Sequence, residues 1–395
     1  MSNINPKILI VGLDNWHSIA RLPRALQAAG FEVAALCYPN GYLASTRHLN
    51  DLFFLRSKRF GGRICRQLVE VITRWQPHMV VPGDDRTVLF FQGMIQLHLE
   101  GKLKLAPAVV ETLRLSFGNF DWLAEATSKQ RTLQRAQKLG LKIPRFACAH
   151  SVEEAVSLAG EIGWPVVVKK SIGSSGSGVT FCDNEQQVAA IHTKYSEASR
   201  WKGKIKSRLI QARGWMLGPA WFPVDRSVKV NEAIRGNPAM IAVAAVNGKV
   251  LTHAIAIKVE CRPQRKGPSS VVRFIQHSGM RQAVEKLVGQ WGVTGLLGFD
   301  FILADNGEAS LIECNPRPIS ITYMGNLSGG DPCLALHHHL AGLEIPAPSA
   351  PRHEVVAHFP NEWRRDPQSP YLANAWHDVP WDDPGLLEKL VKNYR

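Results

Sequence analysis

Several features that mark other protein classes are missing from this 395-residue chain. No hydrophobic run approaches the roughly 20 residues that a membrane-spanning helix needs. The first residues, MSNINPKILIVG, lack the basic region and the cleavage site of a signal peptide. We therefore expect a cytoplasmic protein with no membrane partner.

Cysteine is also sparse and unpatterned. The chain has 7 cysteines, and none of them forms a CxxC pair. An odd number without such pairs argues against a disulfide framework and against a zinc site. We expect most of them to be buried thiols, including Cys314, which alternation turns toward the core side of its strand.

The charge is strongly positive but not concentrated. Lys and Arg number 47 against 33 Asp and Glu, a net charge of +14, with no Lys/Arg block and no nucleic-acid motif. The surplus suits either a polyanionic ligand or simple solubility, and we favour solubility over nucleic-acid binding. The first glycine turn, GLDNWHS, does not match GxGxxG, so a dinucleotide site is unsupported.

The N-terminal part of the sequence shows an alternation of predicted strands and helices. Residues 7–11 and 31–36 predict strands joined by a helix that ends at Gly30, and residues 78–81 predict another strand. This pattern indicates a parallel sheet, whose ligands bind beyond the carboxyl ends of the strands. The polar residues at those ends are acceptor-site candidates, with turn and cap roles as the alternative: Asp14, His17, Asp84, Asp85 and Arg86.

The remaining chain mixes helices, strands and irregular segments. Helices are expected over 127–140, 151–163 and 280–290, and strands over 227–231, 240–246 and 250–257. Residues 194–226 are basic and rich in Trp, and we interpret them as an insertion or flap. The tail from Pro346 shows one helical pattern, over 385–392.

The segment GFDFILADNGEASLIECNPR, residues 298–317, predicts a β-hairpin around Asn306-Gly307. In a two-residue turn the paired residue numbers sum to 613, which pairs Leu303 with Ser310, Phe301 with Ile312 and Asp300 with Glu313. Two opposed carboxylates at this spacing repel by an amount on the order of 3 kcal/mol. We therefore expect a group that offsets this repulsion to lie between the two carboxylates.

Magnesium is our first interpretation of that pairing. Asp300, Glu313 and Asn315 share one face of the ribbon, and Gly298 opposite Asn315 leaves room there. Mg²⁺ prefers hard oxygen ligands and keeps substrate phosphates in its shell. The alternative is structural, with Asp300 or Glu313 paired to Arg317 or to another cation.

A second segment, PVVVKKSIGSSGSGV at 165–179, predicts a buried strand followed by a loop of Gly and Ser. Such a loop can direct backbone N–H groups and hydroxyls at phosphate oxygens, with Lys169 as a point charge beside them. A surface hairpin is the alternative. The candidate nucleotide-binding residues of the loop are Ser174, Ser175, Gly176, Ser177 and Gly178.

In order and spacing, these motifs resemble the ATP-grasp superfamily. The similarity covers about residues 115–340 and includes SKQRT, VVVK, the Gly/Ser loop, NEAIRG and the hairpin that ends in ECNPR. It implies that Lys129 and Lys169 hold phosphates, that Glu232 lies at the adenine edge, and that Asp300, Glu313 and Asn315 bind magnesium. Arg317 would meet the transferred phosphoryl group. Arg273 is a candidate second cation on the γ-phosphate, with an ordinary surface arginine as the alternative.

The expected fold is α/β and α+β: an N-terminal Rossmann-like domain with a parallel sheet, followed by a two-lobed ATP-grasp module. We place the Rossmann-like domain at 1–115, the first lobe with the loop and the insertion at 116–235, the second lobe with the hairpin at 236–345, and a Pro/Trp-rich tail at 346–395.

The resemblance implies an ATP-grasp ligase that forms a carbon–nitrogen bond and releases ADP. A carboxylate would be joined to an amine through an acyl phosphate, with ATP and Mg²⁺ as cofactors, small molecules as substrates, and a homodimer left open. The alternatives are a bicarbonate-activating, carboxylase-type enzyme and a regulatory protein that binds nucleotide without turnover. A structural or nucleic-acid role ranks last.

Overall fold

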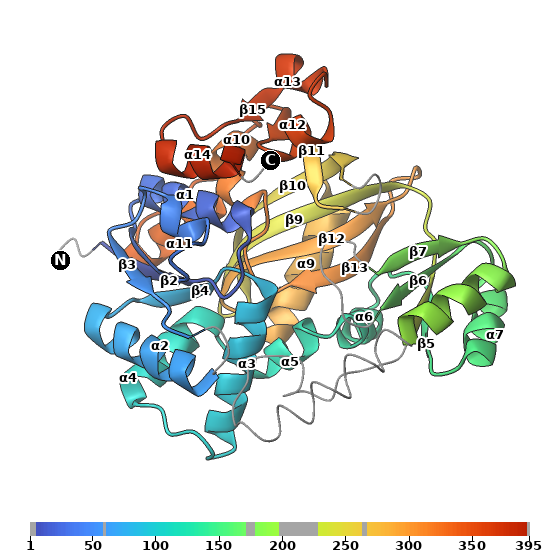
Figure 1. Ribbon diagram of the computed structural model, residues 1–395, viewed down its shortest axis with the longest axis horizontal. Helices are drawn as coiled ribbons and strands as arrows, with labels where there is room; N and C mark the ends of the chain where they lie inside the picture. Colours follow the sequence, from blue (N-terminus) through green and yellow to red (C-terminus); the bar gives the residue numbers. More distant parts are fainter. Residues whose placement is uncertain (1–4, 58–60, 171–177, 197–227, 263–266, 393–395) are drawn as a thin grey trace.

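Figure 1 shows a computed structural model of the chain, which describes residues 5–57, 61–170, 178–196, 228–262 and 267–392. The first part is a parallel sheet of four strands in the order β3-β2-β1-β4. This confirms the predicted parallel sheet. The strands are β1 (Lys7–Val11), β2 (Glu32–Cys37), β3 (Asp51–Phe54) and β4 (Met79–Pro82).

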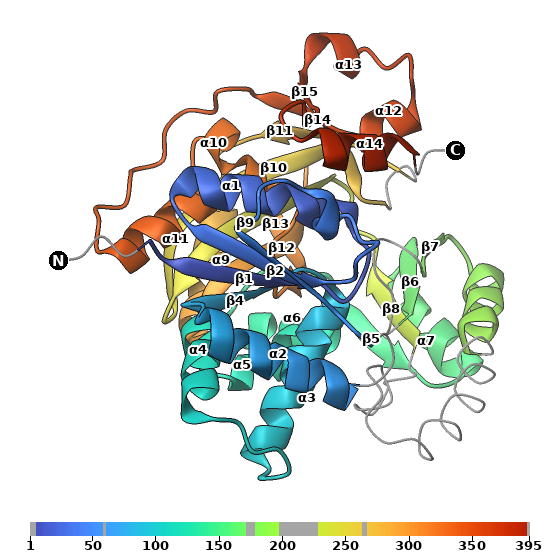
Figure 2. The same ribbon diagram turned by 60° about the vertical axis from the view of Figure 1, so that its left-hand side comes forward.

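Helices cover both faces of this sheet, with α1 on one side and α2 and α4 on the other (Figure 2). Gly30 ends α1 in a left-handed conformation, and a Cβ there would lie 2.7 Å from the ring of His337. The helical segments are η1 (His17–Arg21), α1 (Leu22–Ala29), η2 (Leu43–Ser45), α2 (Gly61–Trp75), α3 (Asp85–Leu99) and α4 (Pro107–Phe117).

A small antiparallel sheet, β5-β8-β6-β7, follows and projects to one side of the molecule (Figure 1). Ser151 caps α7 by accepting the backbone N–H of Glu154, as its sequence predicts. The apolar face of α7 packs on β5 and β8. The elements are α5 (Asp121–Ala126), α6 (Lys129–Lys138), β5 (Phe146–Ala149), α7 (Val152–Ile162), β6 (Val166–Lys170), β7 (Val179–Cys182) and β8 (Val228–Glu232).

The largest sheet has seven strands in the order β13-β12-β9-β10-β11-β14-β15. Its first part comprises β9 (Asn237–Val246), β10 (Lys249–Cys261), β11 (Ser269–Phe274), β12 (Gly295–Leu303) and β13 (Ala309–Asn315). The helical segments beside it are α9 (Ser278–Trp291), η3 (Thr322–Met324), α10 (Gly325–Ser328) and α11 (Pro332–Ala341).

The C-terminal segment is more structured than the single helical pattern predicted. Besides α14 (Pro384–Lys392) it forms β14 (Val355–His358), α12 (Asn361–Arg365), α13 (Tyr371–Asn374) and β15 (Trp376–Asp378). Strand β14 pairs with β11, and β15 pairs with β14, so the segment extends the large sheet. Strands of three or four residues show too little alternation to be detected from sequence.

The hairpin register is correct near the carboxylates and wrong near the turn. Asp300 faces Glu313 and Gly298 faces Asn315, as predicted. A bulge then shifts the pairing by one residue, so that Phe301 faces Leu311 instead of Ile312, and Leu303 faces Ala309 instead of Ser310. The prediction assumed a two-residue turn, whereas the strands end at Leu303 and resume at Ala309.

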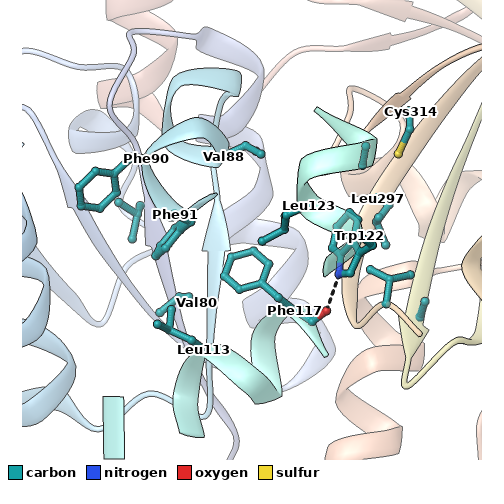
Figure 3. Packing of buried hydrophobic residues seen from close by; sticks show 14 of the residues in the cluster. Val80, Val88, Phe90, Phe91, Leu113, Phe117, Trp122, Leu123, Leu297 and Cys314 are labelled. Carbon is teal, nitrogen blue, oxygen red and sulfur yellow. Dashed lines mark hydrogen bonds between the residues drawn. The ribbon is translucent and has the colours of Figure 1, made fainter. Parts of the chain in front are cut away.

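One hydrophobic core joins the N-terminal sheet to the large sheet. Figure 3 shows part of this core, where the indole of Trp122 donates to the carbonyl of Phe117 at 2.8 Å. Trp122 stacks on Trp291, which stacks in turn on Phe299 of β12. Cys314 is buried in the same core, as expected, and all seven cysteines are thiols outside any disulfide. Among the described residues, no helix combines the length and apolarity needed to cross a bilayer.

Candidate active site

The predicted metal-binding side chains lie together on one face of β12 and β13. Asp300 and Glu313 are cross-strand partners, and the amide of Asn315 donates to Oδ2 of Asp300 at 2.8 Å. The chain therefore brings three oxygen-bearing side chains to one surface. Within the described ranges, no group of three or more His, Cys, Asp or Glu residues could hold a metal by itself. A metal here would need oxygens from a bound phosphate to complete its shell.

Each of the two opposed carboxylates has a lysine partner. Lys258 of β10 lies 2.5 Å from Oδ1 of Asp300, and Lys129 at the start of α6 lies 2.5 Å from Oε2 of Glu313. These lysines offset the repulsion between the acids, so the ligand-free protein does not depend on a metal to tolerate them. The structural alternative paired Asp300 or Glu313 with Arg317 or with another cation. In the structure, that cation is a lysine for both acids.

The lysines also set the pKa values of the cluster. Burial alone would raise the pKa of Glu313, but the charges of Lys129, Lys169 and Lys258 outweigh burial and hold it at about 2. Glu313 in turn raises the pKa of Lys129. Burial acts to lower the pKa of Lys258, yet Asp300 raises it overall. Glu313 is therefore ionised at neutral pH, and Lys129 and Lys258 are protonated.

The pKa of Lys169 differs from those of Lys129 and Lys258, because it is set mainly by burial and not by a carboxylate. Lys169 lies near the end of β6, where burial and the neighbouring charge of Lys129 lower its pKa to about 8. Its cross-strand neighbour on β8 is Lys229, whose side chain is almost fully buried and which also acts to lower the pKa of Lys169. An anion beside Lys169 would relieve this accumulation of positive charge.

The Gly/Ser loop can be followed only in part. Ser174, Ser175, Gly176 and Ser177 lie outside the described residues. Gly178 closes the loop in a conformation with φ of 89°, and its carbonyl accepts the N–H of Lys170 at 2.9 Å. Most of the Trp-rich insertion also lies outside the described residues.

Glu232 ends β8, opposite the first residue of β6. Its carboxylate accepts the backbone N–H of Arg145 at 3.0 Å and lies 3.5 Å from the Arg145 guanidinium. The structure therefore places Glu232 on the same small sheet as Lys169, at the opposite end of their shared strand pair.

Arg317 follows the hairpin and contacts the N-terminal domain. Its Nε lies 2.5 Å from Oδ1 of Asp85, its second nitrogen lies 3.2 Å from Oδ2, and its guanidinium stacks over the ring of Trp16. The neighbouring Asp84 has a different role. It caps α3 and accepts the N–H groups of Leu13 and Asp14, which fixes the turn after β1.

Two expectations from sequence do not fit this arrangement. Arg273 pairs across the sheet with Ile257, the neighbour of Lys258, so it faces away from Asp300, and it contacts Glu354 at 3.4 Å. This placement favours the alternative of a surface arginine. Gly298 does not leave room for a ligand, because a Cβ there would lie 2.3 Å from the side chain of Ile319.

Sequence reasoning missed Lys258 and Lys229. Lys229 lies on a predicted strand and Lys258 directly follows another, but the pairing of β10 with β9, and of β8 with β6, decides which side chains meet. The pairing of strands distant in the chain cannot be read from local patterns, so no signal in the sequence pointed to these two lysines.

Two family models match the part of the chain that carries this site. The model described as "Carbamoyl-phosphate synthase L chain, ATP binding domain" matches residues 128–207, and the model described as "ATP-grasp domain" matches residues 222–320. Together they include Lys129, Lys169, Lys258 and the hairpin.

Curated relatives share a modest identity. The chain is 27% identical over 198 residues to the carbamoyl phosphate synthase large chain of Vibrio cholerae, which covers 50% of this chain and 17% of that protein. It is 25% identical over 292 residues to a formate-dependent phosphoribosylglycinamide formyltransferase of Synechococcus, which covers 71% of this chain and 63% of that protein. The chain thus spans less than two thirds of the length of these relatives.

Solved structures share the fold. The biotin carboxylase domain of Hydrogenobacter thermophilus 2-oxoglutarate carboxylase, in complex with MgADP and bicarbonate, matches with a TM-score of 0.61 at 16% identity and covers 87% of this chain and 71% of its own. An ADP complex of an N5-carboxyaminoimidazole ribonucleotide synthetase matches with a TM-score of 0.58 at 16% identity, covering 89% and 81%. The two family models support the assignment of residues 128–207 and 222–320 to the ATP-grasp superfamily, and the fold agrees with it.

Proposed function

We propose that the protein is an ATP-dependent ligase that joins a carboxylate to an amine through an acyl phosphate and releases ADP and phosphate. The observation that carries this proposal is the single cluster of Lys129, Lys258, Asp300 and Glu313, with the half-buried Lys169 beside it. Such a cluster suits a ligand that brings both phosphate and metal. The metal can replace the lysines as partner of the carboxylates, and the phosphate can replace the carboxylates as partner of the lysines.

The donor set fits magnesium. Asp300, Glu313 and Asn315 offer oxygens from one surface, and none of the three supplies the softer nitrogen or sulfur ligands that zinc favours. When bound, Mg²⁺ would neutralise charge on the phosphate oxygens. The carboxylates would release their lysines, which are then free to contact the nucleotide.

The chain's own residues would act by binding and orientation. Lys169 and Lys129 would hold phosphate oxygens, and Arg317 would orient the carboxylate substrate against the γ-phosphorus. A carboxylate oxygen bonds to that phosphorus as its bond to the β,γ-bridging oxygen breaks, and ADP keeps the electron pair. The amine nitrogen then bonds to the acyl carbon, loses a proton, and phosphate leaves with the C–O bonding pair. Fixed charges stabilise the anionic oxygens in both steps.

The test is ADP release by the full-length protein with Mg²⁺, ATP, pooled amines and pooled carboxylic acids. We expect release only when one acid and one amine are both present, and a carboxylate labelled with oxygen-18 should transfer label to the released phosphate. ADP release that needs bicarbonate would identify the carboxylase-type alternative. Nucleotide binding without ADP release under any combination would support the regulatory alternative.

A further inference from the structure

An ion pair crosses from the hairpin to the N-terminal domain. Arg317 stands just beyond β13, and Asp85 is the first residue of α3 at the carboxyl edge of the parallel sheet. Their contacts of 2.5 and 3.2 Å join both oxygens of Asp85 to two guanidinium nitrogens. Arg317 is 11% exposed, whereas Asp85 is 47% exposed. The carboxylate therefore lies at the open side of the pair.

The pair lies beside the lysine and carboxylate cluster. Arg317 stands two residues beyond Asn315, whose amide donates to Asp300, so the pair follows directly on the proposed metal ligands. On its other side the pair meets apolar surface. Trp16 covers the guanidinium, and a small pocket between residues 16–22 and 318–323 is lined mainly by apolar side chains. Charges in such surroundings interact strongly, and an unmatched one is costly.

The start of α3 is stabilised by the residue before Asp85. Asp84 caps the helix and fixes the turn after β1, with one oxygen accepting from the N–H of Thr87 at 2.8 Å. Asp85 instead turns toward the ATP-grasp module. Its placement brings an acid from one domain to the arginine of the NPR motif in the other.

We infer that the carboxylate substrate is an α-amino acid, whose carboxylate binds Arg317 and whose ammonium group binds Asp85. This inference rests on the proposed function and adds the substrate class to it. An α-amino acid carries an anion and a cation as neighbouring substituents of one carbon. It can therefore enter between Arg317 and Asp85 and replace their ion pair charge for charge, with no change in net charge at the site.

A carboxylic acid without an amino group fits the same place less well. It would take Arg317 from Asp85 and leave that carboxylate unpaired beside a second anion. An amine without a carboxylate would leave Arg317 unpaired against Trp16 and the apolar pocket. The pair thus selects zwitterions, because every other charge type leaves one member of the pair unmatched.

The test is calorimetry of the full-length protein with Mg²⁺ and a non-hydrolysable ATP analogue. The probes are the twenty common L-amino acids and, for the tightest binder, the same acid without its amino group. We expect the deaminated acid to bind roughly tenfold more weakly or worse, equivalent to about 1.4 kcal/mol. In Asp85→Asn the affinity for the amino acid should fall by a similar factor, whereas the affinity for the deaminated acid should not. The ratio of the two affinities should therefore fall toward one.

Glu100→Gln is the control, because Glu100 is an exposed carboxylate at the opposite end of α3. It should keep the wild-type ratio. Unchanged affinity of Asp85→Asn for the ATP analogue shows that the variant is folded. The inference is overturned if no amino acid binds, or if Asp85→Asn keeps the wild-type ratio.

The ADP-release assay separates this inference from the ligase proposal. Amino-acid binding that depends on Asp85, without ADP release in the presence of any amine, would contradict the ligase and support the binding assignment. ADP release that is equally efficient with acids lacking an amino group would overturn the assignment and leave the ligase proposal intact.

Discussion

The molecule contains two groups of ion pairs that differ in burial. In the candidate active site the paired side chains keep contact with solvent, with Lys258 and Asp300 19% and 20% exposed and Lys129 and Glu313 36% and 24% exposed. Where the C-terminal segment meets the N-terminal domain, Arg21 and Asp378 are 5% and 9% exposed. We call the latter pair, with Tyr323 and His358, the C-terminal interface.

The difference indicates which pairs can exchange partners. In the C-terminal interface, Asp378 accepts from both Arg21 and Tyr323, and Arg21 also stacks over the Tyr323 ring. A buried pair held from several sides keeps one arrangement, because separating it would leave a charge unmatched away from water. The pairs of the active site are held across separate strands and helices at a partly open surface. Metal or phosphate can replace one partner there at a lower cost.

The largest effect is expected from Asp378→Asn. The substitution preserves shape but leaves the buried charge of Arg21 unpaired, so the free energy of unfolding should fall by about 3–5 kcal/mol in chemical denaturation. The control is Asp382→Asn, which removes a more exposed pair with Arg24 at 2.6 Å. That loss should stay below about 1 kcal/mol. Equal losses in the two variants would contradict the claim that burial decides how costly it is to break an ion pair in this protein.

Lys169→Met should weaken nucleotide binding by roughly 10- to 100-fold, as expected for loss of a hydrogen bond to a charged group. Because the folded protein lowers the pKa of Lys169, its charge disfavours folding at neutral pH, and the variant should be no less stable than wild type. Lys170→Met is the control, since Lys170 stacks over Tyr195 instead. Calorimetry with ATP measures both affinities, and similar weakening in both variants would argue against a phosphate role for Lys169.

Acid should weaken the C-terminal interface. Burial, helped by the nearby charges of His17 and Arg21, lowers the pKa of His358 to about 3. A histidine with a lowered folded-state pKa stabilises fully above its unfolded pKa near 6.5, and this stability is lost as the pH falls below that value. At pH 5 the loss is roughly 2 kcal/mol at most. In His358→Gln the stability should fall less steeply between pH 7 and 5, and an unchanged slope would contradict the assignment.

A smaller effect concerns protons taken up on binding. The pKa of Lys169 is about 8 in the ligand-free protein, and bound phosphate should raise it. Nucleotide binding near pH 8.5 should therefore take up a fraction of a proton. Calorimetry in two buffers of different ionisation enthalpy measures that uptake, which should disappear in Lys169→Met. Persistence of the uptake in the variant would assign it to another group.

The sequence predicted the parts of the fold that depend on neighbouring residues. Alternation and Asn306-Gly307 correctly located the hairpin and the pairing of Asp300 with Glu313. The bulge between that pair and the turn was missed because it changes the backbone without changing the local pattern. The motif order likewise predicted the fold and named both Lys129 and Glu313, which the structure brings into contact.

Features that depend on distant pairing were not predictable. Lys258 meets Asp300 only because β9 stands between β10 and β12, and Arg317 meets Asp85 only because the two domains pack together. Arg273 shows the converse, since its nearness in sequence to the hairpin suggested a role that the strand alternation removes. The strands of the C-terminal segment were missed because they are short and are stabilised by pairing with β11.

The central claim is that Asp300 and Glu313 exchange their lysines for magnesium when nucleotide binds. The most direct measurement is the affinity of a non-hydrolysable ATP analogue with Mg²⁺ and in EDTA, for wild type and Glu313→Gln. We expect magnesium to strengthen binding to the wild type and to have little effect on Glu313→Gln, while the variant in EDTA loses a little stability because Lys129 loses its partner. If magnesium strengthens binding equally in both proteins, Glu313 is a structural partner of Lys129 and the claim is wrong.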